Sequence, residues 1–190
     1  MFNYLKDLDF RLLVAINQHH TPFLDDVMWF ISGMLSWLPL YIIILISIVI
    51  KYKKKSVPLI LLIALLILAS DQLASGIIKP LFHRLRPSHE PSISGLLHYV
   101  NNYKGGQYGF VSGHSINTFA LAFYMFFVIR KQLIWIPLVL FPWAMMVSYS
   151  RVYLGVHYPS DVIVPILLSM VIAYGISLLY DYLIKKYHTT

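Results

Sequence analysis

The chain has 190 residues, of which 58% are hydrophobic and only 12% are charged, and its mean hydropathy is +0.69. A soluble domain carries about twice that share of charged residues, so the composition indicates a membrane protein. The net charge of +7 does not indicate nucleic-acid binding, because lysines and arginines lie between apolar runs rather than along one stripe. The chain has no cysteine, which excludes disulfides and thiolate metal sites. Its length fits one domain over residues 1–190.

The first 20 residues are expected to form an amphipathic helix at the membrane interface. Acidic residues interrupt this segment, and it lacks the continuous apolar core of a secretory signal. Its apolar residues recur at helical spacing, opposite Lys6, Asp7 and Arg11. They are Leu5, Leu8, Leu12, Leu13 and Ile16.

Five apolar runs follow, each long enough, or nearly so, to cross a bilayer with about 20 helical residues. They are Val27–Ile50, Ser56–Ile78, Gly113–Ile129, Gln132–Ser150 and Val162–Tyr180. The predicted fold is therefore all-α: a polytopic membrane bundle of about five transmembrane helices plus the N-terminal interfacial helix.

Basic residues predict the orientation of this bundle. If each run crosses once, eight of them share one side, which the positive-inside rule makes cytoplasmic. They are Lys51, Lys53, Lys54, Lys55, Arg130, Lys131, Lys185 and Lys186. The opposite side would face outward from the cell (inner) membrane, and its remaining cations need a separate reason to be there.

Three polar stretches meet at that opposite side. Arginine suits bidentate contacts to phosphate oxygens, whereas lysine acts as a point charge. Ser112 and Gly113 stand at a predicted helix N-terminus, where free N–H groups favour an anion. The stretches are Lys79 with Arg86-Pro87, then Ser112-Gly113-His114, then Arg151 with His157 and Asp161.

The last stretch also fits nucleophilic chemistry. Pro159 is expected to begin a helix, placing His157 just outside it and Asp161 in its first turn. A carboxylate there holds the imidazole in one tautomer and raises its nucleophilicity, and His114 can protonate a leaving oxygen. Each fragment alone is more often a turn, an interfacial histidine or a snorkelling anchor. Together, on one face of the membrane, the three fragments predict a phosphate site.

The motifs resemble the type 2 phosphatidic acid phosphatase (PAP2) family of integral membrane lipid phosphatases. Its pattern is Lys-x6-Arg-Pro, then Pro-Ser-Gly-His, then Ser-Arg-x5-His-x3-Asp. The first motif here is KPLFHRLRP from Lys79, and the last is SRVYLGVHYPSD from Ser150, both at full spacing. The middle motif is VSGH, with Val111 where the family usually has proline.

The resemblance implies a reaction without metal or cofactor. His157 would be the nucleophile that forms a phosphohistidine, Asp161 would orient it, and His114 would protonate the leaving group. The phosphoryl oxygens would be held by Lys79, Arg86, Ser112, Gly113 and Arg151. The implied substrate is a membrane lipid phosphate or diphosphate, such as undecaprenyl diphosphate, a lipid A phosphate or phosphatidylglycerol phosphate; the sequence implies no protein partner.

Other functions fit parts of the pattern. Vanadate-dependent haloperoxidases use a similar oxyanion site, but those relatives are soluble. A phosphotransferase would pass the phosphoryl group to an acceptor other than water. A non-catalytic lipid-binding membrane protein would bind the phosphate without hydrolysing it.

Two further features have open roles. Asp71, inside the second run, either pairs with a nearby cation or makes a polar contact between helices. The long 80–112 loop is expected to be either functional or disordered. Four of its basic residues, His83, Arg84, His89 and His98, could contact a headgroup but are mostly expected to be solvated.

Overall fold

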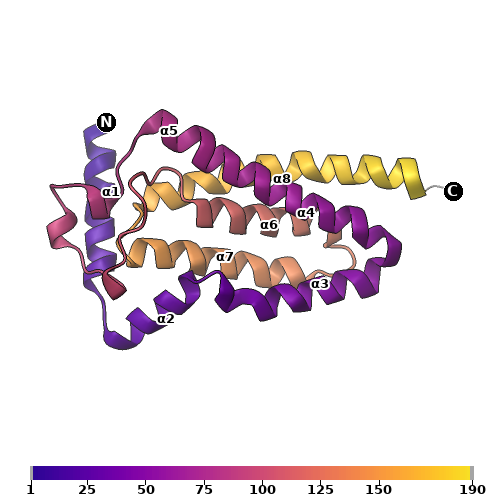
Figure 1. Ribbon diagram of the computed structural model, residues 1–190, viewed down its shortest axis with the longest axis horizontal. Coiled ribbons are helices and arrows are strands. Elements are labelled where there is room, and N and C mark those ends of the chain that lie inside the picture. Colours follow the sequence, from indigo (N-terminus) through magenta and orange to yellow (C-terminus); the bar gives the residue numbers. More distant parts are fainter. Residues whose placement is uncertain (1, 189–190) are drawn as a thin grey trace.

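The computed structural model describes residues 2–188, and within them the chain is helical without a β-strand. Figure 1 shows the longer helices running side by side, with α1 lying across one end of them. The α-helices are α1 (Phe2–Gln18), α2 (Pro22–Ser32), α3 (Leu38–Tyr52), α4 (Ser56–Asp71), α5 (Lys79–Phe82), α6 (Gly113–Ile129), α7 (Trp135–Tyr153) and α8 (Pro159–His188). The all-α bundle is confirmed.

The bundle is organised around α6, which packs against α4, α7 and α8. Its core is apolar and includes Leu66, Met125 and Leu140, each fully buried. The outward faces are apolar too, as at Leu61 and Leu167, which are 65% and 67% exposed. Two helical stretches, Leu35–Phe82 and Pro159–Lys186, are long and apolar enough to cross a membrane, and Gly113–Ile129 is a shorter apolar helix. Such a surface is stable against lipid rather than water.

The predicted N-terminal amphipathic helix is present as α1, and the face that it turns toward the protein is partly polar. Leu5, Leu8 and Leu12 are exposed, and the buried positions are Asp9, Leu13 and Asn17, four residues apart along one face. Leu13 packs with residues of α7 and α8, whereas Asp9 and Asn17 hydrogen-bond to the protein. The helix thus turns a partly polar stripe inward and its leucines outward, an arrangement suited to the membrane interface.

The first apolar run is not one continuous helix, so that prediction is wrong. Helix α2 ends at Ser32, Gly33 is extended, and a 3₁₀ turn (Leu35–Trp37) precedes α3. A Cβ on Gly33 would lie 2.8 Å from Ser36 Oγ and 3.3 Å from the Phe30 carbonyl oxygen, so a larger residue there would displace the Ser36 side chain. Pro39 then stands in the first turn of α3, where its missing N–H costs nothing.

The other runs form helices with shifted ends. The second run comprises α4, a π-helical segment η3 (Gln72–Ile78) and the short α5. The third run is α6 as expected, α7 begins at Trp135 rather than Gln132, and α8 extends through Pro159–His188. Single π-helical turns often occur at functional sites, and η3 lies directly between Asp71 and Lys79.

The two ends of the bundle differ in chemistry. Figure 1 shows the α3–α4 turn, the α6–α7 connection and the C-terminal part of α8 at one end, which carries all eight basic residues named above. The other end holds α1, the long loop, and the junctions before α6 and α8. The three motifs therefore gather at the end opposite the basic residues, as the sequence predicts.

Candidate active site

The three motifs share one cavity of about 650 Å³ at that end of the bundle. Five of the eight predicted site residues line it: Lys79, Arg86, Gly113, His114 and His157. The other three, Ser112, Arg151 and Asp161, are buried close behind this lining. The structure therefore brings all eight residues into one region, from the end of η3, the long loop, the start of α6, the end of α7 and the start of α8.

His157 and Asp161 form a buried pair at the start of α8. The His157 Nδ1 atom lies 3.4 Å from Asp161 Oδ2, which also accepts a hydrogen bond from the Tyr158 backbone N–H at 3.1 Å. Burial, followed by the charges of Arg86 and Arg151, lowers the pKa of His157 well below 6.5. The imidazole is therefore neutral: its Nδ1–H faces the carboxylate, and Nε2 keeps the lone pair needed for attack.

The start of α6 is tied to the start of α8. Ser112 caps α6 through its Oγ, which accepts from the Ser115 N–H at 3.4 Å. The Ser112 N–H donates to the Asp161 carbonyl at 2.9 Å. Gly113, the first helical residue, lines the cavity, where the unpaired N–H groups of a helix N-terminus favour an anion.

Three cations surround this region without a carboxylate partner. Arg86 donates to the carbonyls of Tyr108 and Val156, at 3.2 and 3.4 Å. Arg151 donates to the hydroxyls of Ser32 and Tyr103, and its buried Nε has no partner among the described residues. Lys79 donates to the Ser75 hydroxyl at 3.3 Å.

Buried charges without a counter-ion are costly. Across residues 2–188, no carboxylate lies within ion-pair distance of Lys79, Arg86 or Arg151. A bound anion would supply the missing negative charge, so the arrangement indicates an oxyanion site.

Arg84 has a role that the sequence did not indicate. Instead of being solvated, its guanidinium donates to Asp161 Oδ1 at 2.8 Å and to Asp9 Oδ2 at 2.6 Å. It also donates to the Ser160 hydroxyl and lies 4.1 Å from the centre of the Tyr158 ring. Asp9 in turn accepts from the Ser160 backbone N–H at 2.8 Å. Helix α1 is thus linked through Arg84 to the carboxylate that orients His157.

Two glycines of the long loop lie against the site. A Cβ on Gly109 would sit 2.9 Å from Asp161 Oδ2 and 3.2 Å from Arg86 Cγ. Gly105, with φ of +67°, would place a Cβ 2.8 Å from the Arg86 guanidinium. The loop backbone therefore packs directly on two site residues. The glycine-rich sequence of this loop was the available signal.

Asp71 is closer to the first role considered for it, because its negative charge acts on the Lys79 ammonium although the two groups form no ion pair. Among the described residues it has no ion pair and no hydrogen bond to another helix; it lines the cavity, with Oδ1 near Gly113. Val111, at the position of the usual proline, is fully buried in a small apolar cluster with Ala74 and Ile116. It packs the base of the α6 N-terminus and contributes no polar group.

Comparisons with known proteins agree with this geometry. The model of the PAP2 superfamily matches residues 60–185. The lipid A 4'-phosphatase of Bacteroides thetaiotaomicron is 38% identical over 165 residues, covering 86% of this chain and 72% of that protein. The lipid A 4'-phosphatase of Porphyromonas gingivalis is 33% identical, covering 94% of this chain and 75% of that protein.

Solved structures show the same fold. The transmembrane PAP2-type phosphatidylglycerolphosphate phosphatase from Bacillus subtilis superposes with a TM-score of 0.70 at 24% identity, covering 95% of this chain and 88% of that one. LpxE from Aquifex aeolicus superposes with a TM-score of 0.62 at 29% identity, covering 91% and 96%. The resemblance inferred from the three motifs is confirmed: the chain belongs to the PAP2 superfamily, a family of integral membrane lipid phosphatases.

Proposed function

We propose that the protein is a membrane lipid phosphatase that works through a phosphohistidine. His157 Nε2 attacks the phosphorus and forms a P–N bond as the P–O bond to the lipid breaks. His114 gives a proton to the departing oxygen, and it carries that proton when the phosphate charge offsets the surrounding cations. Water then gives a proton to the neutral His114 and attacks phosphorus, the P–N bond breaks, and phosphate and neutral His157 are released. No metal or cofactor is required in these steps.

Stabilisation of charge would supply most of the rate enhancement. Lys79, Arg86 and Arg151 would hold the equatorial oxygens of the five-coordinate transition state, together with the hydroxyl of Ser112 and the N–H of Gly113. Donors fixed before the reaction cost little reorganisation, and removing one typically lowers the rate about 10²–10³-fold. The uncompensated cations at the cavity support this assignment more than any other observation.

The remainder of the cavity supports a lipid substrate. Away from the cations its wall is formed mainly by apolar side chains of α3, α4 and α6. Met34 and Leu45 line the cavity and are also 72% and 44% exposed, so it reaches the lipid-facing side of the bundle. An acyl chain could therefore stay in an apolar environment while its phosphate reaches His157.

Among lipid phosphates, we propose a sugar phosphate of the lipid A class. The two curated relatives reported above are named for that substrate. Four polar side chains interrupt the apolar wall near the phosphate end: Asp71, Ser75, Asn117 and Thr118. They could hydrogen-bond to sugar hydroxyl and amide groups, which a phosphatidylglycerol phosphate offers in smaller number.

We also propose the placement in the cell. The eight basic residues lie at the end of the bundle away from the cavity (Figure 1). By the positive-inside rule this end is cytoplasmic, and the active site opens on the extracytoplasmic side of the inner membrane.

The test is phosphate release by purified protein in detergent, with EDTA present. Substrates would be lipid A, a polyprenyl diphosphate and phosphatidylglycerol phosphate. Lipid A should be hydrolysed fastest, and EDTA should not abolish activity at temperatures where the treated protein stays folded. His157→Ala should lower activity by about 10³-fold or more, whereas Ser92→Ala, an exposed loop substitution, should not. Full activity of His157→Ala, or activity abolished by EDTA, would contradict the mechanism.

The proton donor can be tested with a better leaving group. His114→Ala should lower lipid hydrolysis by about 10²–10⁴-fold but lower p-nitrophenyl phosphate hydrolysis much less, since nitrophenolate leaves without a proton. His157→Ala should lose both activities. Equal losses on both substrates in His114→Ala would show that His114 is not the acid.

A further inference from the structure

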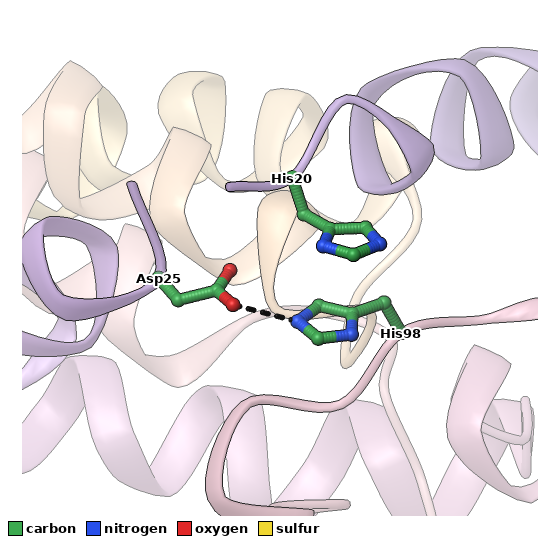
Figure 2. Close-up of side chains that lie close together, drawn as sticks. All are labelled: His20, Asp25 and His98. Atoms are coloured by element: carbon green, nitrogen blue, oxygen red, sulfur yellow. Dashed lines mark hydrogen bonds and ion pairs between the residues drawn. The ribbon is translucent and has the colours of Figure 1, made fainter. Parts of the chain in front are cut away.

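A second cluster of histidine and aspartate lies outside the cavity. Figure 2 shows His20, from the connection between α1 and α2, stacked on His98 of the long loop, with Asp25 of α2 beside them. None of the three lines the active-site cavity. Together they bring three separate segments of the chain to one point at the outer end of the bundle.

The geometry of this cluster is close to that of a ligand set. His98 Nε2 lies 2.8 Å from Asp25 Oδ2. The His20 and His98 rings are nearly parallel, with centroids 3.7 Å apart and an interplanar angle of 7°. One potential ligand atom from each residue lies within 4.8 Å of the other two. Among residues 2–188, nothing hydrogen-bonds to the His20 ring, so its nitrogens are available.

The donor types favour a transition metal over a hard cation. Two imidazole nitrogens and one carboxylate oxygen suit Zn²⁺, whereas Ca²⁺ and Mg²⁺ prefer oxygen ligands alone. Zn–ligand bonds of about 2.0–2.2 Å in a tetrahedron place ligand atoms about 3.3–3.5 Å apart. In the stacked arrangement the two imidazole planes are nearly parallel, so the His20 ring would have to turn out of the stack to direct a nitrogen at an ion held by His98 and Asp25; His20 is exposed and has room to turn.

Neighbouring groups already hold two of the donors in place. Asp25 Oδ1 accepts from the Tyr153 hydroxyl at 2.7 Å, leaving Oδ2 for the cluster. The Asn17 side chain holds the backbone of His98 in place. Asn17 Oδ1 accepts a hydrogen bond from the His98 N–H at 2.8 Å, and Asn17 Nδ2 donates one to the His98 carbonyl at 2.9 Å. Asn17 is fully buried. Such outer contacts orient metal ligands and raise metal affinity.

We propose that His20, Asp25 and His98 bind a structural Zn²⁺ ion that fastens the long loop to α2 and to the α1–α2 connection. A water molecule would complete the tetrahedron. His98 would bind as a neutral imidazole through Nε2 with its proton on Nδ1; because protons compete with the metal for the imidazole nitrogens, binding tightens as the pH rises. The ion takes no part in phosphoryl transfer, and the inference stands independently of the proposed function.

The experiment is a titration of metal-free protein with ZnCl₂ by calorimetry, after any polyhistidine tag has been removed. The variants are His20→Ala and His98→Ala. The matched control is His19→Ala: His19 is also exposed and adjacent in sequence, but its ring bonds to the Ala15 carbonyl and lies outside the cluster. Far-UV circular dichroism would check that each variant is folded.

Wild type and His19→Ala should bind one Zn²⁺ per chain. At Zn²⁺ about 100-fold above Kd, their unfolding temperature should rise by about 5–10 °C. His20→Ala, which removes an exposed ligand, should bind at least about tenfold more weakly and lose this rise, as should His98→Ala. EDTA-treated wild type should keep its phosphatase activity. Absence of binding by wild type, or equal binding by wild type and His20→Ala, would overturn the proposal.

Discussion

Arg84 supports the proposed catalytic pair, His157 and Asp161, without lining the cavity. Its ion pair with Asp161 Oδ1 holds the side of this carboxylate that faces away from His157, and its ion pair with Asp9 anchors the guanidinium itself. Gly109 packs against Asp161 Oδ2 and limits its movement. Removing the guanidinium would leave the buried Asp161 carboxylate with less positive charge beside it and with a less fixed orientation. Arg84 is thus a positioning residue that acts through Asp161.

Arg84→Gln should lower kcat by about 10²-fold, since small misplacements of a catalytic group have effects of that size. KM for the lipid should change little, because Arg84 lines no part of the cavity. Asp9→Asn should act in the same direction but less strongly. Steady-state kinetics on the folded variants would measure both constants, and a raised KM with unchanged kcat would argue against positioning.

His157 makes stability depend on pH. Its pKa is lowered below 6.5 by burial and by Arg86 and Arg151, so the unfolded chain binds the proton more readily. The stability associated with neutral His157 is present above about pH 6.5 and is lost as the pH falls toward the lowered pKa.

The unfolding temperature of wild type should therefore fall between about pH 7.5 and about pH 5.5. In His157→Gln the fall should be smaller, because glutamine does not titrate. Ser112→Ala impairs the same site but keeps His157, so its unfolding temperature should fall with pH as much as that of wild type. Differential scanning fluorimetry in detergent would measure the unfolding temperature at each pH. An equal fall with pH in wild type and His157→Gln would show that His157 does not cause it.

The long loop is a structural wall of the active site rather than a flexible connection. It supplies Arg86 and places Gly105 and Gly109 directly on the guanidinium and the catalytic carboxylate. Leu85 pairs with Tyr108 as an isolated bridge, which brings the two arms of the loop together. The narrow fit explains why glycine stands where the loop passes between Arg86 and Asp161.

Gly109→Ala should lower activity by about tenfold or more, because its Cβ would displace Asp161 Oδ2 or Arg86. Gly95→Ala is the matched control in the same loop, since a Cβ there would meet nothing within 4 Å. Phosphate release and unfolding temperature would be measured for both variants. Similar activity in the two would show that the site tolerates movement of this loop.

The orientation of the whole protein can be tested directly because the chain has no cysteine. Ser92→Cys places a thiol on the exposed loop, and Lys54→Cys places one at the basic end of the bundle. A membrane-impermeant maleimide should label the first in intact spheroplasts and the second only after permeabilisation. The opposite pattern would invert the proposed placement of the active site.

The three motifs predicted the core of the site because their residues lie at element ends, where sequence spacing translates directly into position. His157 and Asp161 flank the start of α8 as Pro159 indicated, and all eight residues converge. Hydropathy could not reveal the break at Gly33, because both halves of that run are apolar. Arg84 was missed because its partner Asp9 is 75 residues away, and only the tertiary fold joins them.

The exposed leucines of α1 have a mechanical consequence. The same helix that turns Leu5, Leu8 and Leu12 outward holds Arg84 through Asp9 on its inner face. Lipid that packs against these leucines therefore acts on the same helix that holds Arg84 and, through Arg84, Asp161. The bilayer thus helps to hold His157 and Asp161 in position through α1. Turnover should therefore differ between micelles and native-like vesicles even when the substrate is the same.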